Sequence, residues 1–374
     1  MKVQPPAFLR TTLPLGIDMI EEYDSGRYHS IWLPDHMVSF WPDSIWTPEF
    51  TDLALHSPSP HRHLDGMAVA AATAVLTKNT PLATCVVDTV RRHPAMLAQT
   101  ALTISHLSKG RFILGLGSGE LENTVPYGFD FDKPVGRMEE AVKVIKLLWH
   151  SDGPVDFEGN FYRLEHARMD TEFYDNTPPP IWFGAAGPRM LKITGTHGDG
   201  WWPAGSFTPE DYAAKLKVIL DAGDAAGRDM SHFVPALTQI CLIGDESEVA
   251  EMIQQPMVKS IILMLTANDL RQFGYEHPMG PDWRGIMDFD PVKLSRDKML
   301  KFCAEMNPQA IRDIFPVGTP RQVAARLKGF VDAGMRVIKI LDYGGMAGSK
   351  FGAMSALKVR EAEDELLLMC KDIT

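Results

Sequence analysis

The sequence predicts a (β/α)8 TIM barrel that forms one domain over residues 1–374 and carries two insertions. Short apolar runs ended by glycine or polar residues alternate with longer stretches in which apolar residues recur every three or four positions. The first pattern is typical of buried parallel strands, and the second of helices that pack on one face of a sheet. About eight such strand–helix pairs in succession indicate this α/β fold.

In the first half of the chain, each expected strand is followed by an expected helix. The run 112–117 (FILGLG) is the clearest strand, because its apolar residues end in alternating glycines. Pro94 stands at the favoured first position of a helix. The expected strands are one near Val3 and those at 30–33, 80–87 and 112–117, and the expected helices are 12–23, 66–76, 94–107 and 134–149.

The second half contains both expected insertions. A hairpin is expected near 154–178, because turn residues at 158–160 separate two short runs. A helical insertion follows near 245–316, and Thr208 has the residue type of a helix N-cap. The expected strands are 181–183, 200–202, 234–243 and 335–341, and the expected helices are 188–194, 208–226, 320–333 and 361–370.

Composition and charge favour a cytoplasmic enzyme that acts on a small molecule. Hydrophobic residues make up 45% of the chain and charged residues 23%, and the net charge of −11 argues against nucleic-acid and anionic membrane partners. The four cysteines, Cys85, Cys241, Cys303 and Cys370, have no CxxC spacing, as expected for reduced thiols. No apolar run reaches the roughly 18 residues of a membrane span, and the first residues lack the apolar core of a signal peptide.

Candidate chemical groups collect at the carboxyl ends of the expected strands, where α/β barrels hold their active sites. Glu120 and Asn123 follow strand 112–117, and Asp35 and His36 follow strand 30–33. A solvent-facing glutamate and a core histidine bonded to backbone are the simpler alternatives for Glu120 and His36. The sequence has no nucleophile elbow, HExxH motif, Walker lysine or metal-ligand cluster, so no metal is expected. It favours a bound cofactor that carries the chemistry while the protein orients it and supplies a proton.

Seven motifs resemble the bacterial luciferase-like superfamily, and most closely its branch that uses the deazaflavin coenzyme F420. They are WLPDH, RRHPAMLAQ, GRFILGLGSGE, RMEEAVKVIKLLW, FEGNFYRL, PIWFGAAGPRML and GDGWW. The resemblance implies a TIM barrel and an oxidoreductase that moves a hydride between the deazaflavin C5 and a carbonyl or alcohol. A monooxygenase that uses reduced FMN and oxygen, and a non-catalytic binder of deazaflavin, are the alternatives.

The resemblance also bears on the substrate and the assembly. The motifs YEHPMG and VPYGFDFDKPVGR are similar to those of a reductase in this branch that acts on a lipid ketone. The aromatic loop within 32–50 and the methionine-rich segment 252–306 agree with a large apolar ketone. Because the family commonly pairs its barrels, the resemblance implies a homodimer.

The resemblance implies His36 and Glu120 as catalytic residues, either of which can supply the proton. The positions that match the family's cofactor contacts are Asp35, His36, Thr84, Cys85, Val87, Gly117, Ser118, Asn123, Gly184, Ala185, Ala186 and Gly187. The turn 184–187 resembles the family's site for the coenzyme phosphate, since bare amides at a helix N-terminus bind phosphate. A simple strand–helix turn is the alternative there.

Further positions near the expected site admit two interpretations. Thr84–Cys85 matches the place where the superfamily keeps a non-prolyl cis peptide bond, and Cys85 is interpreted as a packing residue rather than a nucleophile. Asp88 falls where a sugar-phosphate enzyme of the branch has proline, so its charge can change which substrate is admitted. His61 and His63 lie two apart on a loop, but they lack a third ligand for a metal.

Four more side chains are read either as site residues or as ordinary structure. Arg189 can contact the coenzyme tail or lie in solvent. Phe40 and Trp41 can wall the pocket or simply pack. His277 can cap the substrate side or the turn in which it lies.

Overall fold

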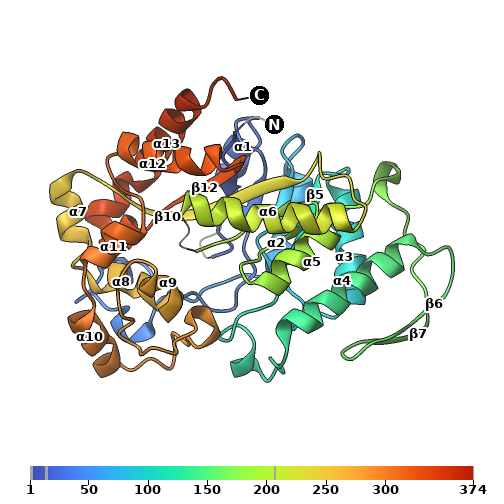
Figure 1. The fold of residues 1–374 in the computed structure, drawn as a ribbon, viewed down its shortest axis with the longest axis horizontal. Coiled ribbons are helices and arrows are strands. Elements are labelled where there is room, and N and C mark those ends of the chain that lie inside the picture. The colour runs from blue at the N-terminus through green and yellow to red at the C-terminus, as the bar shows by residue number, and fades with distance from the viewer. Residues whose placement is uncertain (1–2, 13–15, 206–207, 374) are drawn as a thin grey trace.

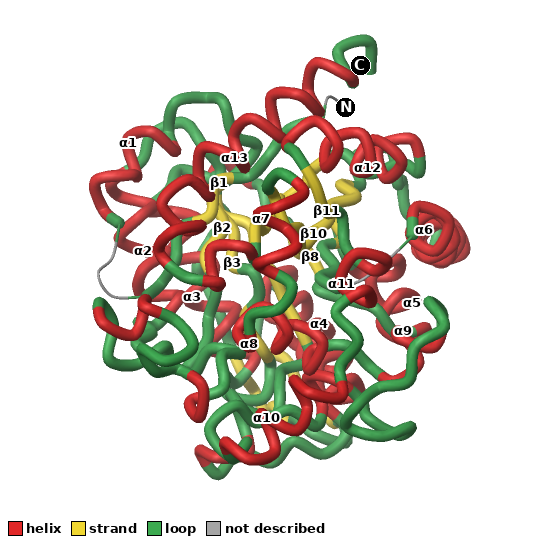
Figure 2. Tube along the Cα trace, turned by 90° about the vertical axis from the view of Figure 1, so that its left-hand side faces the viewer, coloured by secondary structure: helices red, strands yellow, loops and turns green. Residues whose placement is uncertain are grey.

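The computed structural model describes residues 3–12, 16–205 and 208–373, and it shows eight parallel strands around a common axis. In Figure 2 these strands lie at the centre of the molecule with helices around them. They are β1 (Ala7–Phe8), β2 (Ile31–Leu33), β3 (Leu82–Thr84), β5 (Phe112–Gly117), β8 (Ile181–Phe183), β9 (Gly200–Trp201), β10 (Val234–Ile243) and β12 (Val337–Asp342). Two short extensions, β4 (Val87–Asp88) and β11 (Val317–Gly318), pair with β5 and β10.

The sheet closes into a barrel between its first and last strands. Gln4 forms a parallel bridge with Val337, its N–H bonding to Arg336 O at 3.0 Å. Every other junction is a parallel pair in sequence order, from β1–β2 to β10–β12. All strands therefore end at the same rim, and the loops that follow them share one face.

Helices form the outer layer of the barrel (Figure 1). Thr208 and Thr319 are N-caps whose side chains accept from Asp211 N and Gln322 N, as their residue types predict. The helices that follow barrel strands are α1 (Ile20–Tyr23), α2 (Gly66–Leu76), α3 (Pro94–Leu107), α4 (Pro134–His150), α5 (Pro188–His197), α6 (Pro209–Ala225), α12 (Pro320–Asp332) and α13 (Ser349–Met369). None of the described helices is both long and apolar enough to cross a membrane.

Two segments lie outside this alternation. The antiparallel hairpin β6 (Val155–Glu158) and β7 (Arg163–Ala167) projects at one edge of the molecule in Figure 1. Short helices after β10 gather on the opposite side around a second apolar cluster. They are α7 (Glu246–Met252), α8 (Pro256–Lys259), α9 (Ala267–Arg271), α10 (Arg296–Glu305) and α11 (Gln309–Ile314).

Three tryptophans and several smaller apolar side chains fill the barrel interior. Trp32, Trp182 and Trp202 pack there, with the rings of Trp32 and Trp182 edge to face at 6.3 Å. On β3 and β5 this interior cluster has Ala83 and Ile113, which are smaller than the three tryptophans. The active-site residues described below stand on the rim where the strands end.

The structure corrects some of the expected boundaries. The expected helix 12–23 is wrong as a continuous element: residues 13–15 lie outside the described part, and α1 covers only Ile20–Tyr23 after a 3-10 turn at Ile17–Met19. Strand 80–87 is divided into β3 and β4 by an irregular segment at Cys85 and Val86. The last helix begins earlier than expected, at Ser349.

Candidate active site

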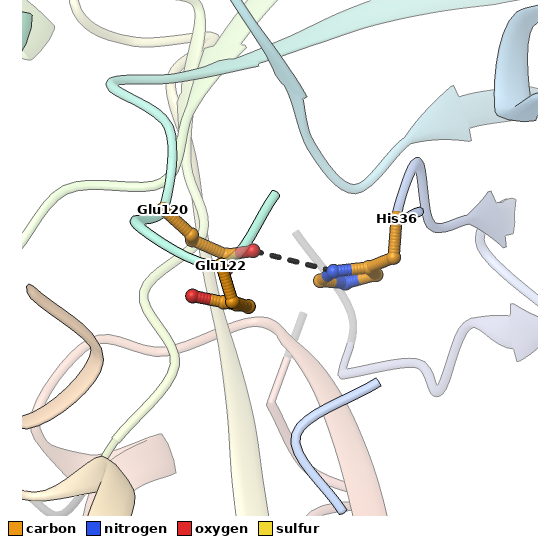
Figure 3. A group of neighbouring side chains, drawn as sticks. All are labelled: His36, Glu120 and Glu122. Atoms are coloured by element: carbon orange, nitrogen blue, oxygen red, sulfur yellow. Dashed lines mark ion pairs between the residues drawn. The ribbon is translucent and has the colours of Figure 1, made fainter. Parts of the chain in front are cut away.

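His36 and Glu120 meet at the rim of the barrel, from the loops that follow β2 and β5 (Figure 3). His36 Nδ1 lies 3.2 Å from Glu120 Oε2, and the two side chains are 19% and 26% exposed. Burial alone would lower the pKa of His36, but the charge and hydrogen bond of Glu120 outweigh it and raise that pKa. Burial acts to raise the pKa of Glu120, yet His36 and Asn123 lower it overall. These opposite shifts favour the ion-paired form, in which His36 is protonated and Glu120 is ionised.

Asn123 fixes this pair in place. Its Oδ1 accepts hydrogen bonds from Met37 N at 2.7 Å and Val38 N at 3.0 Å, so its amide orientation is determined. Its Nδ2 then faces Glu120, donating to Oε2 at 2.9 Å. Nδ2 is also 3.1 Å from His36 Nδ1, but that nitrogen already donates to Glu120, so this contact is not a hydrogen bond. The buried amide thus locks the β2 and β5 loops together.

The second nitrogen of His36 is available to a ligand. Among the residues that the structure describes, none forms a hydrogen bond with His36 Nε2. The ring is flanked by Phe40, edge to face at 5.3 Å between centroids, and by His63 at 5.7 Å. An imidazolium with one N–H bound to a carboxylate and the other free can donate a proton to a bound molecule.

Glu122 joins the cluster and was not singled out from the sequence. Its side chain is 1% exposed, and its Oε1 accepts from Asn123 Nδ2 at 3.1 Å. Burial and the neighbouring Glu120 raise its pKa well above the ordinary value. Ligand atoms of His36, Glu120 and Glu122 all lie within 4.8 Å of one another, but the Asn123 amide, a hydrogen-bond donor, reaches all three. Nothing in the pattern GELEN distinguishes an inward Glu122 from an outward one.

A buried ionic network supports the loops beneath this cluster. Arg91 Nη2 lies 2.9 Å from Asp35 Oδ2, and Arg91 Nε donates to Asp88 Oδ2. Asp35 Oδ1 also accepts from Gly66 N at 2.9 Å and from Arg92 Nη2 at 3.0 Å. The carboxylates of Asp35 and Asp88 are therefore occupied by protein groups, and they tie the loops after β2 and β4 together rather than facing a substrate.

The non-prolyl cis peptide lies between Cys85 and Val86, one bond later than expected from the resemblance. Thr84 continues the regular ladder: its Oγ1 donates to Gly115 O at 3.0 Å and accepts from Gly115 N at 2.9 Å. A two-way bond of this kind uses the whole hydroxyl, so β3 stays joined to β5 through Thr84. The irregular backbone begins after it.

Val86 projects across the neighbouring strands, and glycine makes room for it. A Cβ on Gly117 would lie 2.5 Å from Val86 Cγ2, and one on Gly184 would lie 3.4 Å from Val86 Cγ1. These two glycines were expected to contact a cofactor. Their immediate neighbour is Val86, which was not among the expected cofactor contacts.

Three other positions expected to contact the cofactor lie in different parts of the barrel. They are Cys85, Val87 and Ser118. Cys85 is part of the barrel interior, and burial raises the pKa of its thiol well above the usual range, in agreement with packing. Val87 is fully buried in the outer core between strands and helices. Ser118 is half-buried, and Gly119 turns the chain with φ +91, which favours glycine.

The turn 184–187 is open at its distal end. Ala185 is buried and its carbonyl accepts from Trp201 Nε1 at 2.7 Å. Ala186 and Gly187 are exposed, and Gly187 precedes α5 without any side-chain cap. Pro188 has no N–H, and no side chain caps the helix, so the amides of Arg189 and Met190 can receive an anion.

The remaining candidates take part in ordinary structure. His277 Nε2 lies 3.1 Å from Ile262 O and its Nδ1 accepts from Met279 N, which is a capped turn. Arg189 is exposed and pairs with Glu139 at 2.7 Å. Trp41 packs on Tyr343, with ring centroids 4.9 Å apart.

The two loop histidines bond to their own loop. His61 Nδ1 accepts from Ser39 N at 3.0 Å, and its Nε2 lies 2.9 Å from Asp43 Oδ1. His63 Nε2 lies 2.8 Å from Ser39 Oγ. These bonds hold the loop that carries Phe40 against His36.

Comparison with known proteins identifies the family of the chain. A model of the luciferase-like monooxygenase family matches residues 14–336. The chain belongs to this family. The phthiodiolone/phenolphthiodiolone dimycocerosates ketoreductase of Mycobacterium kansasii is 33% identical over 317 residues, 84% of this chain and 86% of that protein. The F420-dependent glucose-6-phosphate dehydrogenase of Kineococcus radiotolerans is 31% identical over 305 residues, 78% of this chain and 80% of that protein. The protein is thus an oxidoreductase, and the F420-dependent branch expected from its motifs is confirmed.

Solved structures confirm the barrel. An F420-dependent secondary alcohol dehydrogenase in complex with an F420-acetone adduct superposes with a TM-score of 0.71 at 20% identity, covering 98% of this chain and 99% of that one. A long-chain alkane monooxygenase superposes with a TM-score of 0.63 at 15% identity, covering 100% and 92%. At these identities the likeness concerns the fold.

Proposed function

We propose that this luciferase-like protein is an F420-dependent ketoreductase, in which His36 donates the proton that completes reduction of a carbonyl group. The observation that carries the proposal is the position of His36, whose Nδ1 lies 3.2 Å from Glu120 Oε2 while its Nε2 has no hydrogen-bond partner among the described residues. The Glu120 carboxylate raises the pKa of His36, which favours the protonated ring. A ketone becomes an alcohol when its carbon receives a hydride and its oxygen a proton. A deazaflavin, when bound, supplies the hydride at C5.

The residues around the rim suit a cofactor that carries a phosphate. The first turn of α5 has no side-chain cap, Ala186 is exposed, and nothing lies within 4 Å of a Cβ placed on Gly187. We assign the phosphate to this turn. Val86, which packs against Gly117 and Gly184, would be a contact for the ring of the cofactor.

His36 and Glu120 have different roles in the proposed proton transfer. Glu120 keeps His36 protonated and holds its ring through Nδ1, so Nε2–H points to one place on the rim. When the proton leaves, neutral His36 retains its Nδ1–H bond to the carboxylate. Glu120 is therefore the orienting partner, and His36 is the group that touches the substrate oxygen.

An apolar ketone is the proposed substrate class. Phe40 stands against His36 at the rim, and the matched relatives include enzymes named as ketoreductases of dimycocerosates. The proposed substrate is a ketone with an apolar body.

A monooxygenase that uses reduced FMN is the second candidate. It is favoured by the family description and by the fold likeness to monooxygenases. It makes a different demand on the protein, because oxygen must be consumed and no ketone is needed for turnover.

Anaerobic turnover separates the two candidates. We expect reduced F420 to be oxidised without oxygen when simple long-chain 2-ketones are added, and His36→Asn to abolish most of this reaction. Consumption of oxygen with reduced FMN, and none of ketone with F420, would contradict the proposal.

A further inference from the structure

Glu122 is a buried carboxyl group that has no role in the reaction proposed above. Its side chain is 1% exposed. Its Oε1 accepts from Asn123 Nδ2, whereas its Oε2 receives no hydrogen bond from the described part of the chain. An ionised carboxylate buried with one oxygen unsatisfied is costly, and protonation removes most of that cost.

The charges around Glu122 also disfavour its ionised form. Glu120 lies within hydrogen-bonding reach, and Asp290 adds a second negative charge from the segment before α10. The nearby cation is His36, and it pairs with Glu120. Arg91, the next cation, acts on Glu120 and His36 and is itself paired with Asp35 and Asp88. Two adjacent carboxyl groups beside one imidazolium favour a shared proton.

The proton belongs on Glu122 rather than on Glu120. Glu120 Oε2 receives two donors, His36 Nδ1 and Asn123 Nδ2, which stabilise its charge. Glu122 shares the Asn123 donor through Oε1, its Oε2 receives no hydrogen bond, and among the described residues it forms no ion pair. The hydrogen bonds that the two carboxyl groups receive therefore favour an ionised Glu120 and a protonated Glu122.

We propose that Glu122 is held as a neutral carboxylic acid that donates a hydrogen bond to Glu120, so that it acts as a positioning residue for the His36–Glu120 pair. In this arrangement the acid Glu122 donates to the carboxylate of Glu120, and Glu120 accepts in turn from the imidazolium of His36. Figure 3 shows the two glutamates side by side on one loop with His36 opposite. The inference deepens the proposed function, because it concerns the same proton-donating site.

This arrangement sets how firmly His36 holds its proton. A hydrogen bond from Glu122 draws charge from Glu120, which weakens the hold of Glu120 on the imidazolium. An ionised Glu122 would instead add a second negative charge and make His36 a poorer acid. The neutral acid thus orients Glu120 without overstabilising the charged imidazole.

The test replaces Glu122 in two ways and follows His36 directly. Glu122→Gln keeps a neutral donor of the same shape, and Glu122→Met keeps the length but removes the hydrogen bond. The pKa of His36 is read by NMR of the labelled imidazole in the protein without cofactor. This readout does not depend on any turnover, so failure of the ketoreductase proposal leaves it interpretable.

We expect Glu122→Gln to leave the pKa of His36 unchanged and Glu122→Met to raise it by about 1, the effect of one lost charge-assisted hydrogen bond. We also expect a protonated carboxyl band, sensitive to exchange into D2O, in the infrared spectrum at neutral pH, and its loss in Glu122→Gln. A fall of the His36 pKa in Glu122→Gln would show an ionised Glu122 and overturn the proposal. An unchanged pKa in a folded Glu122→Met would overturn the positioning role. If Glu122→Met does not fold, Glu122→Gln and the infrared band decide alone.

Discussion

His36 Nδ1 and Glu120 Oε2 are 3.2 Å apart although their residues come from loops after different strands of the barrel. The two loops follow β2 and β5. Both strands are parallel neighbours of β3, so the loops lie on the same rim. The contact therefore depends on the pairing of β2, β3 and β5 in the sheet rather than on any local motif. It leaves His36 with one bound and one free ring nitrogen, which is the geometry of a proton donor.

Replacement of His36 tests that role. We expect His36→Asn to lower the rate of ketone reduction by roughly 10²- to 10⁴-fold, the usual contribution of a positioned acid. Cofactor affinity should change little, because the proposed phosphate site on α5 lies on another strand–helix unit. Turnover and fluorescence titration of F420 measure the two effects separately. Equal loss of binding and turnover would contradict a role in proton transfer.

Replacement of Glu120 tests the pH dependence. The pKa of His36 is raised in the folded protein by Glu120, so the proton-donating form is complete below the ordinary pKa and is lost as pH rises through the raised value. Glu120→Gln removes that charge, and the loss of reductase activity should then occur at lower pH. A pH–rate profile of kcat/KM checks the direction. A shift to higher pH, or no shift, would contradict the ion pair.

Asn123 should matter for stability as well as activity. Asn123→Ala leaves the N–H groups of Met37 and Val38 unpaired and removes the donor to Glu120 and Glu122. We expect a loss of about 2–4 kcal/mol in the free energy of unfolding, measured by urea denaturation. Asn268→Ala, on the exposed surface of α9, is the matched control and should change the stability by less than about 0.5 kcal/mol. Similar losses in both would contradict the locking role.

Gly117 should be restricted by Val86. A Cβ at position 117 would lie 2.5 Å from Val86 Cγ2, so Gly117→Ala should cost about 1–3 kcal/mol. Adding Val86→Ala should restore much of that loss, because it removes the clashing methyl group. Gly153→Ala, where no atom lies within 4 Å of the added Cβ, is the control. Additive losses in the double variant would show that Val86 is not the obstacle.

Residue patterns predicted those parts of the molecule that depend on local signals. Strand 112–117 and helix 66–76 match their observed bounds, because each combines a clear apolar pattern with a marked end. The placement of His36 near Glu120 followed from both lying just after a strand in one barrel. The helix expected at 12–23 was overextended, since that stretch also contains Pro14 and Gly16.

Features that depend on contacts between strands could not be read in this way. One such feature is the position of the cis peptide bond at Cys85–Val86. Another is the packing of Val86 against Gly117 and Gly184, which involves three strands. Glu122 points into the cluster because of the turn at Gly119, and the alternation of residues in GELEN does not reveal that direction. The carboxylate of Asp35 was expected at the cofactor, but it bonds to Gly66, Arg91 and Arg92.

A titration of the purified protein with F420 and, separately, with FMN tests the central claim most directly. Quenching of the coenzyme fluorescence at physiological salt reports binding without any assumption about the substrate. We predict binding of F420 at micromolar concentration or tighter and no binding of FMN in the same range. Tight binding of FMN with no binding of F420 would contradict the account and make this barrel a flavin-dependent monooxygenase.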